Sequence, residues 1–240
     1  MSQIQPSSKA LELGRQVLRI EAEAVLALSD RINGSFLQAL TLILNCHGRV
    51  IVSGIGKSGH IGRKIAATLA STGTPAFFVH PAEASHGDLG MITAEDVVIG
   101  ISNSGESAEL LNILPSIKRQ GAKLIAMTGN EKSSLSRDAD VHLDAGVAQE
   151  ACPLNLAPTA STTAALALGD ALAVALLDAR GFGAEDFARS HPGGSLGRRL
   201  LTRMRDVMRS GEAIPVVVPE ASVTEAIREI TRGSIGMTVV

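Results

Sequence analysis

The sequence predicts an α/β fold, a doubly wound parallel sheet of five strands with helices on both faces. Five short apolar runs rich in β-branched residues lie at residues 49–54, 76–80, 96–102, 122–128 and 140–145. Helical segments separate them, chiefly residues 58–72 and 106–119. Buried strands that alternate with helices are typical of a parallel sheet. Ligands of such sheets bind at the carboxyl ends of the strands, so we expect the functional site there.

Further helices are predicted before and after these strands. Apolar residues recur at spacings of three and four over residues 10–32, which indicates an amphipathic helix. A second helical run follows at residues 36–46. The segment 159–180 is rich in alanine, leucine and threonine, and it predicts a largely buried helix after the last strand.

The domain division follows from a change of pattern near Met204. Beyond this residue the sequence reads as strand, turn, helix and strand, ending in an apolar run. We therefore predict one domain over residues 1–204, which includes a pair of N-terminal helices at residues 10–46. The second predicted unit covers residues 205–240.

Composition excludes several classes of partner. The 240 residues carry a formal net charge of −2, with five phenylalanines and no tyrosine or tryptophan. A basic surface and stacking aromatic side chains are therefore both lacking, and we expect no nucleic-acid partner. The N-terminus has no apolar signal region, and Gly169 and Asp170 interrupt the longest apolar run. These features predict a cytoplasmic protein without a membrane span.

A glycine-rich loop at residues 53–62 follows the first predicted strand. A dinucleotide site would need an acidic residue at the end of the second strand, which instead ends in His80. A P-loop would need glycine at position 51, which is Ile51. The loop then brings the backbone close to a ligand and presents Lys57 at the start of a helix. The simpler alternative is a tight turn with a solvated lysine.

A serine-rich loop at residues 101–107, ISNSGES, follows the third strand. Its hydroxyls are those of Ser102, Ser104 and Ser107, and the next helix begins here. Free backbone N–H groups and the helix dipole make such an end an anion site, which suits a phosphate monoester. The alternative is ordinary capping of the helix by Ser104 or Ser107.

A third polar loop, residues 149–163, follows the last strand. It contributes Glu150, Cys152 and a hydroxyl cluster at Thr159, Ser161, Thr162 and Thr163. Glu109 lies one turn into the helix after the serine loop, and His191 precedes the sequence Pro-Gly-Gly. Each of these residues alone is commonly a surface group, and Glu150 alone could cap a helix. Their number near strand ends favours a site.

The order of these loops resembles that of the SIS (sugar isomerase) domain. The strings EACPLNLAPTASTTAALALGDALA and HPGGSLGRRL, together with the serine loop, are similar to the arabinose-5-phosphate isomerase family over roughly residues 10–205. Beyond them, residues 205–240 resemble the start of a CBS domain, of which the family usually carries a tandem pair. We therefore expect a partial first CBS domain at residues 205–240.

The resemblance implies reversible isomerisation of D-ribulose 5-phosphate and D-arabinose 5-phosphate, an early step towards the eight-carbon acid sugar Kdo of lipopolysaccharide. It implies no required cofactor, and zinc at His80 as a possible inhibitor. Its catalytic residues map to Lys57, Glu109, Glu150 and His191. The substrate-binding residues that it implies are Gly56, Ser58, Gly73, Thr74, His80, His86, Ser102, Asn103, Ser104, Gly105, Ser107, Thr159, Ser161 and Thr162.

The chemistry suggests a role for each catalytic candidate. Isomerisation passes through a cis-enediol(ate), so it needs a carbon base, an oxygen acid and a cation. We expect Glu150 to be the base, with a pKa tuned toward neutrality, and Glu109 is the alternative. His191 would open the sugar ring or carry the oxygen proton, and Lys57 would stabilise the enediolate.

Two further expectations concern assembly and competing functions. We expect a homotetramer in which His191 reaches the site of a neighbouring subunit. Two other functions remain open: isomerisation of another phosphosugar, and a non-catalytic SIS sensor that binds a sugar phosphate.

Overall fold

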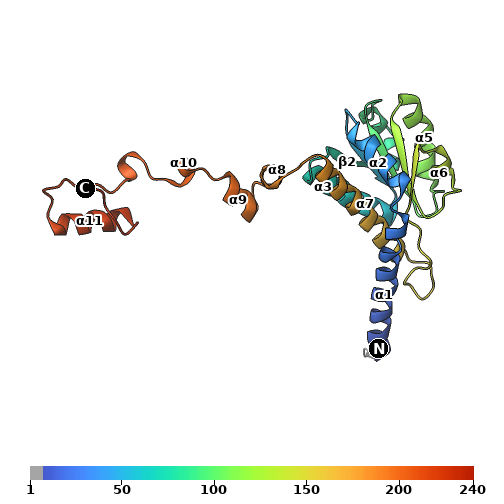
Figure 1. Cartoon of the computed structure of the whole chain (residues 1–240), viewed down its shortest axis with the longest axis horizontal. Coiled ribbons are helices and arrows are strands. Elements are labelled where there is room, and N and C mark those ends of the chain that lie inside the picture. Colours follow the sequence, from blue (N-terminus) through green and yellow to red (C-terminus); the bar gives the residue numbers. More distant parts are fainter. Residues whose placement is uncertain (1–7) are drawn as a thin grey trace. The chain divides into compact units, whose positions relative to one another are not determined.

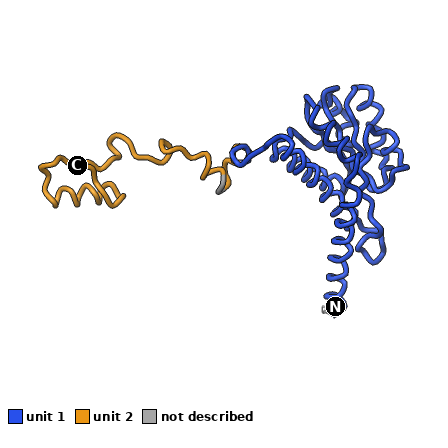
Figure 2. The backbone as a smooth tube through the Cα atoms, viewed as in Figure 1, with its two compact units in different colours: residues 1–187 blue, residues 188–240 orange. Residues whose placement is uncertain are grey.

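The computed structural model describes residues 8–240, without the side chains of residues 195 and 196 (Figure 1). The chain forms two compact units that divide between Phe187 and Ala188 (Figure 2). The first unit contains the sheet and the predicted site loops, and each unit is described in turn.

The first unit is built on a five-stranded parallel sheet with the order β2-β1-β3-β4-β5. Its strands are β1 (Val50–Gly54), β2 (Ala76–Val79), β3 (Val97–Ile101), β4 (Lys123–Thr128) and β5 (Val141–Asp144). All pairings are parallel. The prediction of five parallel strands is therefore confirmed, with each strand inside its predicted run.

Helices cover both faces of this sheet, as predicted. One face carries α2 (Gly34–Leu44), α3 (Gly56–Ser71) and α7 (Ala160–Ala179), and the other carries α4 (Pro81–Ala84), α5 (Ala108–Gln120) and α6 (Ser134–Asp138). Neighbouring strand residues point to opposite faces: Val52 packs in the core with α3 and α7, whereas Ile51 packs in the core with α5. The sheet is thus doubly wound.

The predicted helix over residues 10–32 is divided. The first helix, α1, covers Ser8–Leu26, and a 3₁₀ turn η1 follows at Ser29–Arg31. The Ser29 hydroxyl donates to the Leu26 carbonyl oxygen at 2.7 Å, which satisfies a carbonyl left unpaired at the end of α1. Helix α1 packs against α7, yet none of its residues is buried.

Helix α7 is the predicted buried helix of the core. By length and composition it is, among the described helices, one that could cross a membrane, but half of its apolar window is buried inside the fold. It packs against α3, where Lys64 and Asp170 form an ion pair between the two helices. The helix thus reads as a core element of the domain.

The second unit starts within the short helix α8 (Ala184–Ser190). It continues through α9 (Ser195–Leu201), α10 (Met204–Val207), the 3₁₀ turn η3 (Gly211–Ala213) and α11 (Val223–Gly233). A parallel bridge joins Val216 to Val239, so the predicted order of strand, helix and strand is reduced to one helix and one bridge. The unit starts at residue 188, whereas the predicted boundary followed residue 204. The CBS resemblance of residues 205–240 stays a prediction.

Candidate functional site

The topology of the sheet places a crevice between β1 and β3. These strands are neighbours, but β1 leads into α3 on one face and β3 leads into α5 on the other. The two connections therefore diverge at the carboxyl edge, which is the topological switch point where doubly wound sheets bind ligands.

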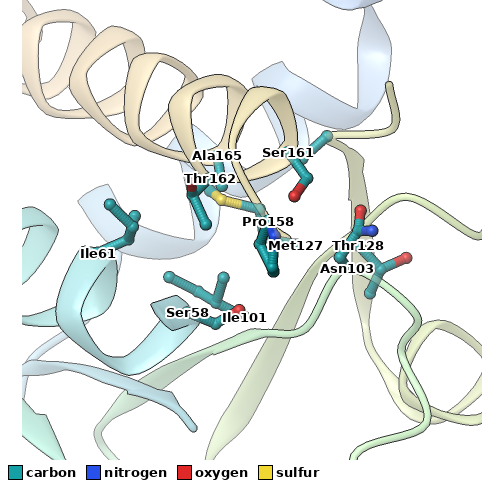
Figure 3. Close-up of a pocket in the computed structure, with 11 residues that line it drawn as sticks. Ser58, Ile61, Ile101, Asn103, Met127, Thr128, Pro158, Ser161, Thr162 and Ala165 are labelled. Carbon is teal, nitrogen blue, oxygen red and sulfur yellow. The ribbon is translucent and has the colours of Figure 1, made fainter. Parts of the chain in front are cut away.

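A pocket lies at this edge (Figure 3). Four predicted substrate-binding residues line it together: Ser58, Asn103, Ser161 and Thr162. Its other lining residues are Ile61, Ile101, Met127, Thr128, Ala145, Pro158 and Ala165. The pocket thus joins the β1–α3 turn, the β3–α5 loop, the end of β4 and the start of α7.

The β1–α3 turn brings Lys57 to this edge. The turn is tight because a Cβ on Gly59 would lie only 2.7 Å from the Gly54 carbonyl oxygen. Lys57 is the second residue of α3, is exposed and makes no hydrogen bond or ion pair within the described residues. Its ammonium is therefore available to an anionic ligand.

The serine loop leaves the N-terminus of α5 open. Ser107 is the N-cap residue, but its side chain accepts no hydrogen bond from the helix. Its Oγ instead lies 2.8 Å from Oγ of Ser102, and Ser104 Oγ accepts from Glu106 N at 3.2 Å. Neither serine therefore caps α5, contrary to the simpler alternative. The N–H groups of Leu110 and Leu111 donate to the Ser107 carbonyl oxygen, so within the described residues those of Ala108 and Glu109 are left for an anion.

The N-terminus of α7 is closed by the Glu150 carboxylate. Glu150 Oε2 accepts from Thr159 N at 2.7 Å, from Thr159 Oγ1 at 3.0 Å and from Ser161 N at 3.2 Å. Partial burial raises the pKa of Glu150, but the donors of Ser161 and Thr159 more than offset burial and leave that pKa lowered. The expectation of a near-neutral pKa was wrong, because the loop turns the carboxylate onto a helix end.

The hydroxyl cluster at the start of α7 divides into engaged and free groups. Thr162 Oγ1 donates to Thr159 O at 2.8 Å, and Thr163 Oγ1 donates to Glu21 Oε2 at 3.2 Å. Ser161 Oγ is buried and lines the pocket; it lies near enough to the Glu150 carboxylate to lower the pKa of that group, but it makes no hydrogen bond of good geometry among the described residues. Ser161 is thus the hydroxyl of this cluster best prepared to meet a ligand.

Two predicted substrate contacts lie away from this pocket. Gly73 and Thr74 precede β2, so they stand at the amino edge of the sheet, opposite the pocket. Thr74 is buried, and its hydroxyl accepts from Arg180 Nε at 3.2 Å. The described chain does not bring them to the other site residues, and their substrate contacts stay a prediction.

The predicted histidines occupy three different places. His80 follows β2 and caps α4, because its Nδ1 accepts from Ala82 N at 3.3 Å. His86 is exposed just after α4, and His191 belongs to the second unit. Within the described residues, no three His, Cys, Asp or Glu side chains cluster in a way that could hold a metal ion. The zinc contact of His80 remains a prediction.

Glu109 completes the set of catalytic candidates. It lies in the first turn of α5, is exposed, and forms no hydrogen bond or ion pair within the part of the chain that the structure describes. The two predicted glutamates thus differ: Glu150 is engaged at the end of α7, whereas Glu109 stands free at the end of α5.

Part of the pocket lining was not predicted from the sequence. Thr128 is the last residue of β4, and its position at a strand end was a usable signal. The apolar contacts of Ile61, Met127 and Pro158 carried no such signal, because apolar residues at these positions read as ordinary core.

Comparisons with known proteins find a matching family and similar sequences. The SIS domain family matches residues 43–175. The chain is 60% identical over 237 residues to "Arabinose 5-phosphate isomerase KdsD" of Yersinia pestis, covering 99% of this chain and 72% of that protein. It is 62% identical over 226 residues to the protein of the same name from Pseudomonas aeruginosa, covering 94% and 69%.

Solved structures show the same fold. Escherichia coli CFT073 c3406 in complex with arabinose 5-phosphate matches with a TM-score of 0.75 and 45% identity, covering 78% of this chain and all of that one. Vibrio vulnificus NanR complexed with ManNAc-6P matches with a TM-score of 0.64 over 80% of this chain and 73% of that one, but at 18% identity. The second likeness concerns the fold alone.

Proposed function

The chain belongs to the arabinose 5-phosphate isomerase family of SIS-domain proteins, and we propose that it interconverts D-ribulose 5-phosphate and D-arabinose 5-phosphate. The choice of sugar rests on relatives of that name at about 60% identity. The observation that carries a phosphosugar ligand is the N-terminus of α5, which has no side-chain cap and follows the loop of the pocket residue Asn103. Free N–H groups, serine hydroxyls and the helix dipole suit a phosphate monoester.

The phosphate anchors the substrate in this proposal. The loop 102–107 and the free Ser161 hydroxyl hold it, so that binding energy orients C1 and C2 of the open-chain sugar. Lys57 stands beside the pocket residue Ser58 at the start of α3. Its charge stabilises the enediolate oxygen.

Glu109 is the better carbon base of the two glutamates. It removes a proton from C1 of the ketose and returns one to C2, while a second proton moves from the C1 oxygen to the C2 oxygen. Three hydrogen bonds to Oε2 of Glu150 stabilise its ionised form and lower its pKa, which makes this carboxylate a weaker base. Glu109 makes no such contacts within the described residues.

The remaining parts of the proposal concern assembly and conditions. We propose a homotetramer in the cytoplasm in which His191 of one subunit serves the site of another as ring-opening or oxygen acid. The exposed α1 is the element most suited to subunit contacts, since it carries Leu11, Leu18 and Leu26 at roughly two-thirds exposure or more. The reaction needs no cofactor, and zinc at His80 would inhibit it. Its product feeds synthesis of Kdo.

Proton NMR tests this function directly. The chain is incubated with D-ribulose 5-phosphate and EDTA in D₂O, and we expect signals of D-arabinose 5-phosphate with deuterium at C2. Turnover in EDTA would also support the absence of a required metal. Tight phosphosugar binding by a folded chain without any product would refute the isomerase and favour a sensor.

A further inference from the structure

A partly buried hydrogen-bonded pair, which the sequence did not predict as part of the site, lies at the end of β4 beside the pocket. Thr128 ends β4, is buried and lines the pocket, and its Oγ1 lies 2.9 Å from Nε2 of His142 on β5. His142 pairs with Ala126 in the parallel register, so Thr128 lies two residues further along on the same face. Neither the isomerisation chemistry nor the family resemblance assigns a role to His142.

The direction of this hydrogen bond follows from the other partners of Thr128. Its Oγ1 lies 2.9 Å from the carbonyl oxygen of Asn130 and 3.0 Å from the Asn130 N–H. A carbonyl can only accept, so the one hydroxyl proton goes to Asn130 O. The hydroxyl then accepts from Asn130 N–H and from His142, whose Nε2 must carry a proton. His142 is the donor that completes this turn.

The same turn supports the serine loop. Gly129 N donates to Asn103 O at 2.9 Å, and Leu135 N donates to Gly105 O at 3.1 Å. Gly105 has a φ of +69°, and a Cβ there would lie 2.1 Å from Ser133 Oγ. The segment after β4 therefore lies directly against the loop, and any shift of residues 128–130 reaches Asn103.

We propose that His142 is a positioning residue for phosphate binding. Its Nε2–H fixes the Thr128 hydroxyl, which fixes the turn 128–130 and, through Gly129 N, the backbone of Asn103. The inference rests on the proposed function only in assigning the phosphate of a sugar to this loop. His142 touches no substrate, and its effect is on affinity.

The test compares two amide substitutions of His142. The Nε2 of Gln lies as many bonds from Cβ as that of His, so His142→Gln keeps a donor in reach of Thr128. The shorter amide of His142→Asn resembles Nδ1 and cannot reach. We expect His142→Asn to raise the KM for D-ribulose 5-phosphate about tenfold with kcat within about twofold, and His142→Gln to match the parent.

Inorganic phosphate binding, measured by calorimetry on the same proteins, separates this inference from the reaction. The Kd should rise about tenfold in His142→Asn and in Thr128→Val, and stay near the parent in His142→Gln and Thr128→Ser. If the parent shows no turnover, the Kd values for inorganic phosphate in these variants still test the role of His142. Equal affinity in all variants would overturn the proposal, as would equal loss in Gln and Asn, which would indicate a need for the ring.

A spectroscopic readout covers the case in which a variant folds poorly. In the unaltered chain, the ¹⁵N shifts of the neutral His142 ring should show the proton on Nε2. A ring protonated only at Nδ1 would contradict the donor role whatever the variants do.

Discussion

The N-termini of α5 and α7, both at the carboxyl edge of the sheet, share serine- and threonine-rich sequences but differ in what occupies them. At α5, Ser102 and Ser107 hydrogen-bond to each other and leave the first turn open. At α7, the Glu150 carboxylate accepts from two backbone N–H groups, those of Thr159 and Ser161. A carboxylate already accepts from the backbone N–H groups of Thr159 and Ser161 at the α7 end, so α7 can offer a phosphate the Ser161 hydroxyl but not these N–H groups. The difference supports the proposal that the phosphate binds at α5 and that Glu150 stabilises the wall of the pocket.

The largest expected effect concerns the two carboxylates. Glu109→Gln should lower kcat about 1000-fold, because a positioned general base contributes about 10²–10⁴. Glu150→Gln removes the charge that caps α7 and should lower kcat about tenfold or less, because the N-terminus of α7 is then less firmly held. The measurement is deuterium uptake from D₂O into the substrate, with phosphate affinity as the control for binding. Loss of exchange in Glu150→Gln with normal exchange in Glu109→Gln would reverse the assignment.

A second experiment makes the α5 end resemble the α7 end. In Ser107→Asp, the new carboxylate can accept from the Glu109 N–H, which has no partner among the described residues, and should repel a phosphate. We expect the KM for the phosphosugar to rise about 100-fold while the melting temperature stays level or increases. Ser222→Asp is the matched control, since Ser222 already caps α11 in the second unit. An unchanged KM in Ser107→Asp would remove α5 from the phosphate site.

The two hydroxyls at the start of α7 offer a finer comparison. Ser161 Oγ is buried without a hydrogen bond of good geometry among the described residues, whereas Thr162 Oγ1 already donates to Thr159 O. Ser161→Ala should raise the KM about tenfold and leave stability level or higher, because it removes an unsatisfied polar group. Thr162→Val should alter the KM about twofold at most. Titration with inorganic phosphate and thermal melts would check both, and a larger KM effect in Thr162→Val would exchange their roles.

The strands and the site loops could be predicted from the sequence, but the contacts at the two helix N-termini could not. The strands were predictable because buried parallel strands are continuous apolar runs, and the site loops because they follow the strand ends. What occupies each helix N-terminus was not predictable, because it depends on which hydrogen-bond donors the nearby carboxylate and hydroxyl oxygens contact in the folded chain. Glu150 lies nine residues before Thr159, and no sequence periodicity predicts that the loop folds back so that Glu150 accepts from Thr159 N. For the same reason, the sequence could not distinguish a capping Ser107 from one paired with Ser102.

The smallest expected effect is the contribution of Glu150 to stability, and its pH dependence has a definite sign. The folded-state pKa of Glu150 is lowered, so its ionised form stabilises the fold above the unfolded pKa of about 4.3. That contribution is lost as the pH falls from there through the folded pKa. Glu150→Gln should therefore reduce the free energy of unfolding by about 1 kcal/mol at pH 7, the usual worth of an N-cap.

Urea unfolding of the unaltered chain and Glu150→Gln at pH 7 and in steps down to about pH 3 measures this difference. The difference in the free energy of unfolding between the two proteins should narrow as the pH falls below about 4.3, because the protonated carboxyl and the amide are then both uncharged. Glu109→Gln is the matched control and should track the unaltered chain, since Glu109 makes no hydrogen bond or ion pair within the described residues. A gap that widens in acid would mean that Glu150 is protonated in the folded state, and with it the contrast between the two helix ends would fail.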